Sequence, residues 1–527
     1  MKLKCKLIFY LPIVCMQLAA VSQSAKTVMP VFSKAIATNP VVPLIKGQSF
    51  NQLVKLSVYI PASQNVVCKN FELHLDANAV KAIEKIDVIV RDERERSFLT
   101  GAVTYGSTNI LSAKTNIPVN VPMKQGWNTV WFGAVLKDDA DIDKKVMITL
   151  KNITTNNGTQ LVKQQVNSNT RRLGIAVRKA WDDSVHTYRI PGITTTSKGT
   201  LLAVYDIRYK NSGDLPGNID VGMSRSTDGG RSWEPMKVIM DMGAPHENNG
   251  IGDPAILFDP ATKRIWVAAL WSKGNRSIAG SKPGLSPDTS GQFVLVSSDD
   301  DGLTWSEPYN ITAQVKNPGW HLYFNGPGNG IVMQNGTLVF PSQYWDGTTK
   351  PSPVGIPHSS IIYSNDGGKT WKSGTGAKSN TTESQVVETT PGTLMLNMRD
   401  NRGRYRSIAT TTDMGSTWLE HITSTTALPD PVCMAGFTKA RVKVKEQSKD
   451  VLFFSNVATQ TGRNHTTIKA SLDLGETWPA KNDLLLDERN GYGYSAIIKI
   501  DNNTIGIIYE GERDLYFLRV PVADIVK

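Results

Sequence analysis

Cysteine is scarce in this chain, with four residues among 527. Two of them, Cys5 and Cys15, lie in the N-terminal apolar segment, and the other two, Cys68 and Cys433, are far apart. Small domains that depend on disulfides carry many more cysteines at close spacing. We therefore expect no disulfide framework in the mature protein.

Metal-binding motifs and long apolar runs are also missing. The seven histidines show no ligand spacing such as HExxH, so neither a metal nor another cofactor is expected. One apolar stretch, 7–20, follows three lysines and precedes small residues, but it is too short to span a bilayer. This arrangement is typical of a cleavable export signal, predicted here over residues 1–24. We expect a periplasmic, cell-surface or secreted protein with no transmembrane segment.

The chain is long enough for more than one domain and carries a formal net charge of +11. A basic exported protein is compatible with acidic glycans or anionic surfaces, although charge alone does not identify a partner. Residues 25–155 contain short β-rich runs separated by Pro, Gly and Asn, which predicts a β-sandwich. The polar stretch 156–172 is predicted to be a linker, and 173–527 contains repeats.

One motif, Ser/Thr-x-Asp-x-Gly-x-Ser/Thr-Trp, occurs five times, every roughly 50–70 residues. Its aspartates are Asp228, Asp300, Asp366, Asp413 and Asp473. In each copy the Asp is suited to accept backbone N–H groups of a turn, Gly supplies a positive φ, and Trp covers the turn. Such a repeat predicts a β-propeller in which these aspartates are structural.

A second repeat gives the direction of each blade. Gly-Thr-Leu occurs at 199–201, 336–338 and 392–394, and 263–265 and 503–505 occupy the equivalent place in two further units. Each segment begins an apolar strand after a turn, so this turn and the Asp-containing turn lie at the same edge of a blade. A sixth unit lacks the Asp motif and is one strand short. Residues 172–180 are predicted to supply that strand and close a six-bladed ring.

Chemically reactive side chains fall at the opposite edge. The first strands of the blades contribute Arg189, Asp253, Glu383 and Tyr494, the second strands contribute Arg208, Trp271 and Arg399, and the connections after these strands contribute Asp214 and Arg463. The first strands of a propeller line its axis, so we expect these residues to converge on one depression. Several arginines and carboxylates together are costly to arrange unless they bind a ligand.

The chain from 173 to about 525 resembles the bacterial exo-sialidases, or neuraminidases. The resemblance rests on Tyr188-Arg-Ile-Pro191, Asp253-Pro254, LNMRD around Arg399, TGRN around Arg463, and YGYS around Tyr494. The fourth Asp motif departs from the pattern by beginning with Thr. Tyr492 competes with Tyr494, and Asp220 competes with Asp214. The N-terminal part is similar to the carbohydrate-binding-like sandwich that some of these enzymes carry.

The resemblance implies a retaining exo-α-sialidase that releases terminal sialic acid through a covalent sialyl-tyrosine intermediate. Arg189, Arg399 and Arg463 would clamp the sugar carboxylate, because guanidinium groups form bidentate, charge-assisted hydrogen bonds with carboxylates. Tyr494 would be the nucleophile and Glu383 its base. A neutral phenol avoids the repulsion that a carboxylate nucleophile would meet at a carbon already bearing a negative group.

The remaining residues have expected supporting roles. Asp214, on a loop with Gly and Pro, would be the acid and then the base. Asp253 would orient the substrate, and Arg208 would contact its carboxylate end, support the acid loop or form a structural ion pair. Trp271 is expected either to wall the N-acyl pocket or to pack in the blade. Two tryptophans of the first domain, Trp127 and Trp131, are candidates for a sugar platform or for core packing.

Three alternatives stay open. A trans-sialidase would use the same residues and transfer the sugar to an acceptor, whereas a sialic-acid lectin would lack the acid, base or nucleophile. An Asp-motif propeller that serves as a protein-binding scaffold would need no convergent arginines. Under the resemblance we expect sialylated glycans, glycoproteins or glycolipids as partners, no nucleic acid, and a monomer.

Overall fold

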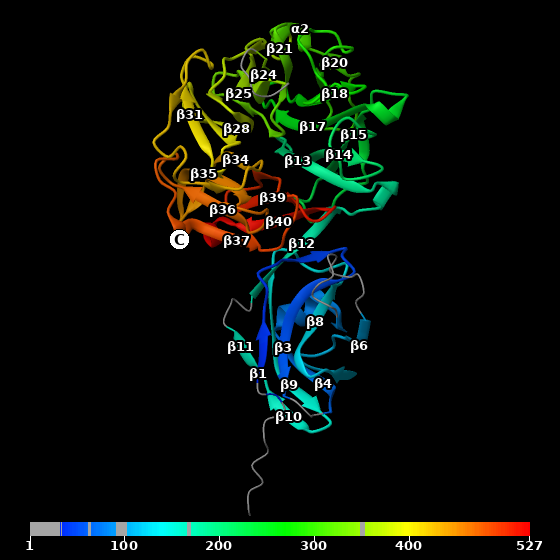
Figure 1. Cartoon of the computed structure of the whole chain (residues 1–527). Coiled ribbons are helices and arrows are strands. Elements are labelled where there is room, and N and C mark those ends of the chain that lie inside the picture. Colours follow the sequence, from blue (N-terminus) through cyan, green and yellow to red (C-terminus); the bar gives the residue numbers. More distant parts are fainter. Residues whose placement is uncertain (1–31, 33, 62–64, 91–102, 166–169, 348–353) are drawn as a thin grey trace, which may run out of the picture.

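The computed structural model describes residue 32 and residues 34–61, 65–90, 103–165, 170–347 and 354–527. Two β-rich bodies lie one above the other, the N-terminal one below and the C-terminal one above in Figure 1. The predicted export signal, 1–24, lies outside the described residues. Within the part of the chain that is described, no helix combines the length and apolarity needed to cross a membrane.

The N-terminal body consists of two packed sheets. The first has the order β11 (Lys163–Gln165), β1 (Lys34–Thr38), β3 (Asn51–Ile60), β8 (Gly126–Leu136), β5 (Ile83–Val90) and β6 (Val103–Asn109). The second contains β7 (Lys114–Met123), β4 (Val66–Leu75), β9 (Lys145–Thr155) and β12 (Thr170–Arg178), with β10 (Gly158–Leu161) paired to β9. A short helix, α1 (Ala77–Ala82), begins where Asp76 Oδ1 accepts the Ala79 N–H at 2.7 Å.

Alternation along β8 builds the core between these sheets. Val130, Phe132 and Ala134 point inward and are buried, and the Phe132 ring meets the Phe71 ring of β4 edge to face at 5.0 Å. The two tryptophans of β8 point to the outer face, where Trp127 is 57% exposed and Trp131 is half-buried. The alternative that Trp127 packs in the core is therefore wrong.

Residues 156–172 differ from the linker predicted for them. The strand β10 pairs with β9, β11 pairs in parallel with β1, and the start of β12 (170–172) pairs with 145–147. Both β10 and β11 are largely exposed. A strand at the edge of a sheet needs backbone hydrogen bonds rather than apolar burial, so its sequence carries no apolar alternation to reveal it.

The described part of the C-terminal body forms six blades. Blade one has β13 (Thr187–Thr195), β14 (Leu201–Arg208), β15 (Ile219–Ser226) and β16 (Lys237–Met240). Blade two has β17 (Asn249–Phe258), β18 (Ile265–Lys273), β19 (Gln292–Ser298) and β20 (Tyr309–Asn310), with β22 (Gly328–Asn329) added to β17. Blade three has β21 (Trp320–Asn325), β23 (Ile331–Val332), β24 (Leu338–Asp346), β25 (Ile356–Ser364), β26 (Lys372–Ser373) and β27 (Lys378–Ser379).

The other three blades complete the ring. Blade four has β28 (Thr381–Thr390), β29 (Thr393–Asp400), β31 (Ser407–Thr411) and β32 (Leu419–Glu420), and the small pair β30 (Arg404–Tyr405) and β33 (Pro429–Asp430) accompanies it. Blade five has β34 (Gly436–Val444), β35 (Gln447–Val457), β36 (Thr466–Ser471) and β37 (Asp483–Asp487). Blade six has β38 (Ser495–Lys499), β39 (Thr504–Glu510), β40 (Leu515–Pro521) and β12. Two short helices accompany the blades. The helix α2 (Thr312–Val315) precedes β21 of blade three, and α3 (Val522–Ile525) follows β40.

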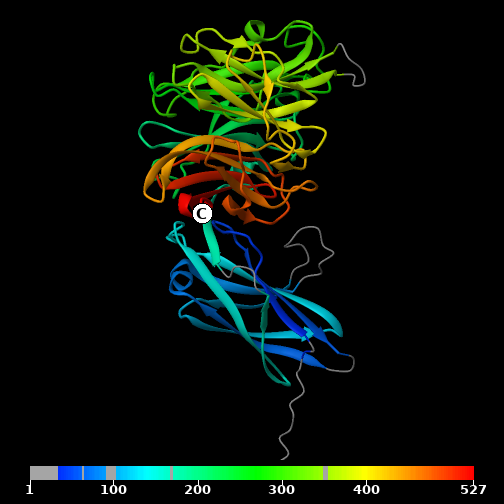
Figure 2. The same cartoon turned by 90° about the vertical axis from the view of Figure 1, so that its left-hand side faces the viewer.

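The strand β12 belongs to both bodies. Ile175 and Ala176 pair with Phe517 and Tyr516 of β40, which confirms that the segment before blade one supplies the missing strand of blade six. The same strand begins on β9 of the sandwich and is also paired in parallel by β2 (Leu44–Lys46). Figures 1 and 2 both show it running from the lower body into the upper one.

Side-chain contacts also fix the two bodies against each other. Ile45 of β2 is buried in the apolar cluster that blades five and six share. On the Asp-turn side, Asp143 accepts hydrogen bonds at 2.5 Å from both Arg231 and Arg519. A continuous strand, an inserted apolar side chain and a paired carboxylate together leave little freedom for a hinge.

The five Asp-containing turns have the predicted structural role. In the third, Asp366 accepts hydrogen bonds from Thr370 Oγ1 at 2.6 Å, the Thr370 N–H at 3.0 Å and Ser364 Oγ at 2.8 Å. The bonds from Thr370 lower the pKa of Asp366 to about 2. In blade one, Ser226 of the Asp-turn edge pairs with Leu201, at the opposite end of β14 from Arg208. These turns therefore lie away from the edge that carries the predicted site.

We expect Asp366→Ala to lower the thermal midpoint of unfolding by roughly 2–4 °C, because a turn loses its acceptor. Differential scanning fluorimetry of both proteins measures the shift, and activity at 25 °C should stay unchanged. Because the pKa of Asp366 is lowered in the folded state, its contribution is present above about pH 4 and fades as pH falls towards 2. Substitution of the exposed Glu307 by Ala is the control, and an equal shift there would contradict the assignment.

Candidate active site

The predicted residues converge on the side chain of Tyr494, just before β38. Arg399 Nη1 donates to Tyr494 Oη at 2.9 Å. The guanidinium carbons of Arg189 and Arg463 lie 5.1 and 5.8 Å from the centre of the Tyr494 ring. Three arginines from three different blades thus surround one phenol, which is 5% exposed.

β-Bulges aim several of these side chains at the mouth of the ring. The first strands of blades one, two and four each lose register at the functional residue, between Arg189 and Gly192, Gly252 and Ala255, and Thr381 and Ser384. Ile190 and Asp253 also have positive φ values of 58° and 56°. For non-glycine residues, and for a β-branched one above all, this conformation is strained and must be held in place by the surrounding structure. Bulges redirect side chains, which explains why regular alternation does not describe this edge.

Glu510, at the end of β39, anchors the base of the site. One oxygen accepts from Arg189 Nε at 3.0 Å and from the Ile190 N–H at 2.9 Å, and the other accepts the Tyr494 N–H at 2.9 Å. Both Arg189 and Glu510 are buried. A buried arginine needs such a partner, and this carboxylate also ties the backbone of blade one to that of Tyr494.

Tyr494 is paired with a carboxylate that suits a base. Its Oη donates a short hydrogen bond to Glu383 Oε1, while Glu383 Oε2 accepts from Arg399 Nη1 at 2.6 Å. Burial and the neighbouring Glu383 raise the pKa of Tyr494 well above its usual value, against the opposing charges of Arg399 and Arg189. The phenol is therefore protonated in the free protein, and its proton has an acceptor in contact.

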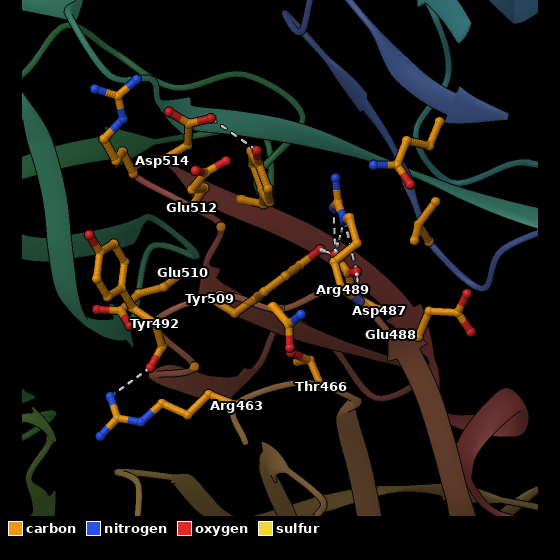
Figure 3. A pocket seen from close by; sticks show the side chains of 18 of the residues that line it. Arg463, Thr466, Asp487, Glu488, Arg489, Tyr492, Tyr509, Glu510, Glu512 and Asp514 are labelled. Carbon is orange, nitrogen blue, oxygen red and sulfur yellow. Dashed lines mark hydrogen bonds and ion pairs between the residues drawn. The ribbon is translucent and has the colours of Figure 1, made fainter. Parts of the chain in front are cut away.

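The competing tyrosine has a different environment. The Tyr492 ring lies 4.5 Å from the Arg189 guanidinium, and its carbonyl accepts from Arg463 Nη1 at 2.9 Å, as Figure 3 shows. Arg463 Nη2 also donates to the Val432 carbonyl at 3.2 Å. Tyr492 thus helps to hold Arg189 and Arg463. The carboxylate that could act as a base, Glu383, contacts the hydroxyl of Tyr494. The geometry favours Tyr494 over Tyr492 as the reactive phenol.

Asp214 lies over the arginines on the loop between β14 and β15. Its Oδ1 accepts from Arg189 Nη1 at 3.2 Å and from Arg208 Nη1 at 2.7 Å, and its side chain is 77% exposed. Although partial burial raises it, the charges of Arg208 and Arg189 hold the pKa of Asp214 below its ordinary value. Arg208 also donates to the Ser212 carbonyl at 2.8 Å, so it supports the acid loop.

Asp220, the competing acid, faces elsewhere. It is buried and accepts from Tyr209 Oη at 3.0 Å. Burial and the charge of Asp241 raise the pKa of Asp220 to about 6. Such a pKa would suit an acid, but the arginines bind Asp214. The geometry therefore favours Asp214.

Two further carboxylates are neighbours at the site: Asp206 is buried and Asp253 is half-buried. Asp206 accepts from Arg208 Nη2 at 2.8 Å and from the Asp253 N–H at 2.8 Å. Burial, together with the charges of Asp206, Asp214 and Glu383, raises the pKa of Asp253 well above its usual range. Asp253 therefore keeps its proton to a higher pH than an ordinary aspartate, which is compatible with an orienting role. Arg208 forms the structural ion pair and supports the loop at once.

A cavity of about 390 Å³ opens beside Tyr494. Asp214, Asp253, Glu383 and Arg399 line its polar part. Its apolar wall includes Leu270, Ile278, Ala279, Phe324 and Trp345. Trp271 is not among the described residues that line this cavity. It packs on the apolar cluster of blades one and two, and its Nε1 donates to Asn249 at 2.8 Å. The packing interpretation of Trp271 is thus the correct one, since neighbours in a strand face opposite sides.

Comparison with known proteins agrees with this geometry. The BNR repeat-like domain family matches residues 199–507. A sialidase of Bacteroides fragilis is 47% identical over 412 residues, which cover 76% of this chain and 74% of that protein. The chain belongs to the sialidase family.

Further relatives support this assignment. A sialidase of Micromonospora viridifaciens is 34% identical over 331 residues, covering 61% of this chain and 50% of that protein. The solved structure of the Hadza microbial sialidase Hz136 is 38% identical with a TM-score of 0.86, covering 93% of this chain and all of that one. The protein is an exo-α-sialidase, a glycoside hydrolase that acts on sialylated glycans.

The sequence did not lead us to predict Glu510 or Asp206, although the position of Glu510 at the end of a strand was a usable signal. Glu510 ends the second strand of blade six, in the register that identified Arg208 and Arg399. Asp206 points from the interior of β14 and has no distinguishing motif around it. Each of the two residues holds an arginine, Glu510 holding Arg189 and Asp206 holding Arg208.

We expect Glu510→Gln to lower kcat/KM for a fluorogenic α-sialoside by about 10–100-fold, because buried hydrogen bonds to a charged group are lost. The loss should appear mainly as a raised KM, since Arg189 loses its orientation. Steady-state kinetics measures both constants, and circular dichroism verifies folding. Glu476→Gln, at the Asp-turn edge, is the matched control, and equal kinetics of the two variants would contradict the positioning role.

Proposed function

We propose that this sialidase is a retaining hydrolase whose nucleophile is Tyr494 and whose intermediate is a covalent sialyl-tyrosine. The observation that carries the proposal is the short contact between Tyr494 Oη and Glu383, with Arg399 bonded to both. A phenol with a raised pKa needs a base in contact to become a nucleophile. Glu383 meets that need, and Arg399 stabilises the phenolate as it forms.

The three arginines suit the carboxylate of the substrate. Sialic acid carries its carboxylate on the anomeric carbon, so clamping that group holds the reacting carbon over Tyr494. Arg189 and Arg463 both lie by the Tyr494 ring, Arg189 also lies by the Tyr492 ring, and Arg399 donates to the Tyr494 hydroxyl. Each charge-assisted hydrogen bond contributes about 1.5–3 kcal/mol. The apolar wall of the cavity suits the methyl end of an N-acyl group.

Asp214 would become an acid only when substrate binds. In the free protein Arg189 and Arg208 keep its pKa low. The substrate carboxylate competes for Arg189, so its arrival takes away one of the two cations and adds a nearby anion. Both changes raise the pKa of Asp214 towards the range in which a general acid works.

The reaction then proceeds in two balanced steps. Tyr494 Oη bonds to the anomeric carbon and gives its proton to Glu383, while the glycosidic C–O bond breaks and Asp214 protonates the leaving oxygen. In the second step Asp214 takes a proton from water, the water oxygen bonds to the anomeric carbon, and Tyr494 leaves and recovers its proton from Glu383. Two inversions give net retention.

The alternatives differ in the fate of the intermediate or in the side chains that they require. Transfer to a sugar acceptor uses the same residues, and product analysis with added lactose separates it from hydrolysis. A lectin without catalysis needs no acid, base and nucleophile in contact, and here the three candidates stand together. We further propose that the protein is an exported monomer, acting on glycoproteins or glycolipids.

Tyr494→Phe should lower kcat/KM for a fluorogenic α-sialoside by at least about 10²-fold, because covalent catalysis is lost. Tyr492→Phe keeps the ring over Arg189 and should lose less than about tenfold. Mass spectrometry of the wild type inactivated by a difluorinated sialic acid should locate the label on Tyr494. The reverse order of the two variants, or a label on Tyr492, would reject the assignment.

Asp214→Asn should be selective for the leaving group. A sugar leaving group needs protonation, so its release should slow by about 10²–10⁴-fold, whereas an activated aryl group should slow by about tenfold or less. Kinetics with both substrates tests the difference. Asp220→Asn is the control, and a larger selective loss in that variant would move the acid to Asp220.

A further inference from the structure

Arg463 is held differently from the other arginines at the site, which are paired with carboxylates. Within the part of the chain that the structure describes, the partners of Arg463 are backbone oxygens. Its Nη1 donates to the Tyr492 carbonyl at 2.9 Å, a bond that Figure 3 shows, and its Nη2 donates to the Val432 carbonyl at 3.2 Å. The direction of this guanidinium group therefore depends on where the two carbonyls are placed.

One peptide group links Arg463 to a buried carboxylate. The Val432–Cys433 peptide lies in the loop between β33 and β34. Its C=O accepts from Arg463, and its N–H donates to Asp430 Oδ1 at 2.8 Å. A trans peptide is planar with N–H and C=O pointing in opposite directions, so a bond at one end fixes the direction of the other. An anion at the N–H and a cation at the C=O also polarise the same group, which strengthens both hydrogen bonds.

The backbone of this loop is strained and has to be held. Val432 has a φ of 65°, which a β-branched residue adopts only where its surroundings impose it. The next residue supplies the restraint: the Cys433 carbonyl accepts a short hydrogen bond from Arg406 Nη1, and the Cys433 thiol donates to the Tyr492 carbonyl at 3.7 Å. Burial raises the pKa of this thiol to about 12, so its proton is present at neutral pH. Both carbonyls that bind Arg463 are thus tied to Cys433.

Arg406, just before β31, connects this loop to the strand that carries Arg399. Its Nε donates to Asn397 Oδ1 at 2.7 Å and its Nη2 donates to the Asn397 carbonyl at 3.2 Å, and Asn397 lies on β29 with Arg399. Arg406 Nη1 lies 3.7 Å from Asp430 Oδ2, and both side chains are buried. Apolar side chains of the same volume often stabilise a core as well as such a pair does. Stability alone therefore does not account for it.

We propose that Asp430 and Arg406 are positioning residues for the carboxylate of the substrate. Together they hold the Val432–Cys433 peptide, and this peptide sets the direction of Arg463. The inference rests on the proposed function, because the direction of Arg463 matters only if that arginine binds the sugar carboxylate. It gives the third arginine of the clamp a carboxylate partner that acts through one peptide group.

The first test is a double-mutant cycle in the full-length protein with a 4-methylumbelliferyl α-sialoside. Asp430→Asn keeps the shape of the side chain and removes its charge. KM should rise about 5–20-fold while kcat changes by less than about threefold, because the substrate carboxylate is bound in the ground state and the transition state alike. Added to Arg463→Ala, the same substitution should change kcat/KM by less than about twofold, since it acts through Arg463. A fall of equal size in both backgrounds would overturn the inference.

A second measurement does not depend on catalysis. The 2,3-didehydro analogue of sialic acid and its methyl ester differ only at the carboxylate, so the ratio of their dissociation constants reports the clamp. Isothermal titration calorimetry should show the preference for the acid reduced about fivefold or more in Asp430→Asn. Arg406→Lys should do the same, because one ammonium nitrogen replaces a planar group with three. An unchanged preference in either variant, or a loss of folded protein in both by circular dichroism, would overturn the inference.

Asp301→Asn is the matched control. Asp301 is also buried and pairs with a buried arginine, Arg225, at 3.1 Å, but at the Asp-turn edge. Its substitution should leave KM and the preference for the acid unchanged, and a change equal to that of Asp430→Asn would count against the positioning role. If Arg463→Ala raises KM but the cycle is additive, only this inference fails. If Arg463→Ala alters neither KM nor the preference, the carboxylate clamp of the proposed function fails and this inference fails with it.

Discussion

The pairing of β12 with β40 is the constraint on which the rest of the molecule depends. Without that strand, blade six would expose the edge of β40 and the ring would lack its last outer strand. The strand comes from the segment between the sandwich and blade one, so completing the ring also attaches the first domain at a fixed angle (Figure 1). The position of Tyr494 depends on it as well, because blade six carries both Glu510 and the loop that ends at Tyr494.

Charge compensation is the second organising feature. Arg189, Arg208 and Arg399 would be costly to bury alone, and each is paired with its own carboxylate: Glu510, Asp206 and Glu383. Arg463 instead donates to two backbone carbonyls. The arginines are thus oriented before substrate arrives, which spares the reorganisation that flexible cations would need. The same carboxylates shift the pKa values of their neighbours, as Glu383 does for Tyr494. Residues that hold the arginines in place therefore also affect the reactivity of the site.

Sequence repeats predicted the fold and most of the site because they define register. Turns at one edge place Arg189, Asp253, Glu383 and Tyr494 at the other, and the structure brings these residues together. The prediction that Trp271 lines the pocket was wrong because side chains one residue apart on a strand point to opposite faces. Its neighbour Leu270 lines the cavity instead. The position of a residue at the end of a strand does not by itself tell which of two neighbours faces the cavity where the pairing of the strands is irregular.

Two other features had no local signature. The edge strands β10 and β11 are polar and exposed, so their role depends on partners far away in the sequence, β9 and β1. The cavity between the sandwich and the propeller is formed by segments far apart in the sequence, such as those holding Gln48 and Asp514, 466 residues apart, and it exists only when both domains are folded. Long-range geometry of this kind leaves no pattern within one repeat.

The position of Asp214 gives the resting protein an internal occupant for its cationic pit. Its carboxylate lies on Arg189 and Arg208, so it is a tethered competitor, at high effective concentration, for any small anion that approaches Arg189. A ligand that engages all three guanidinium groups and the cavity beside them overcomes that competition, whereas chloride or acetate gains too little. The loop thus discriminates against ions that share the charge of the substrate but not its size.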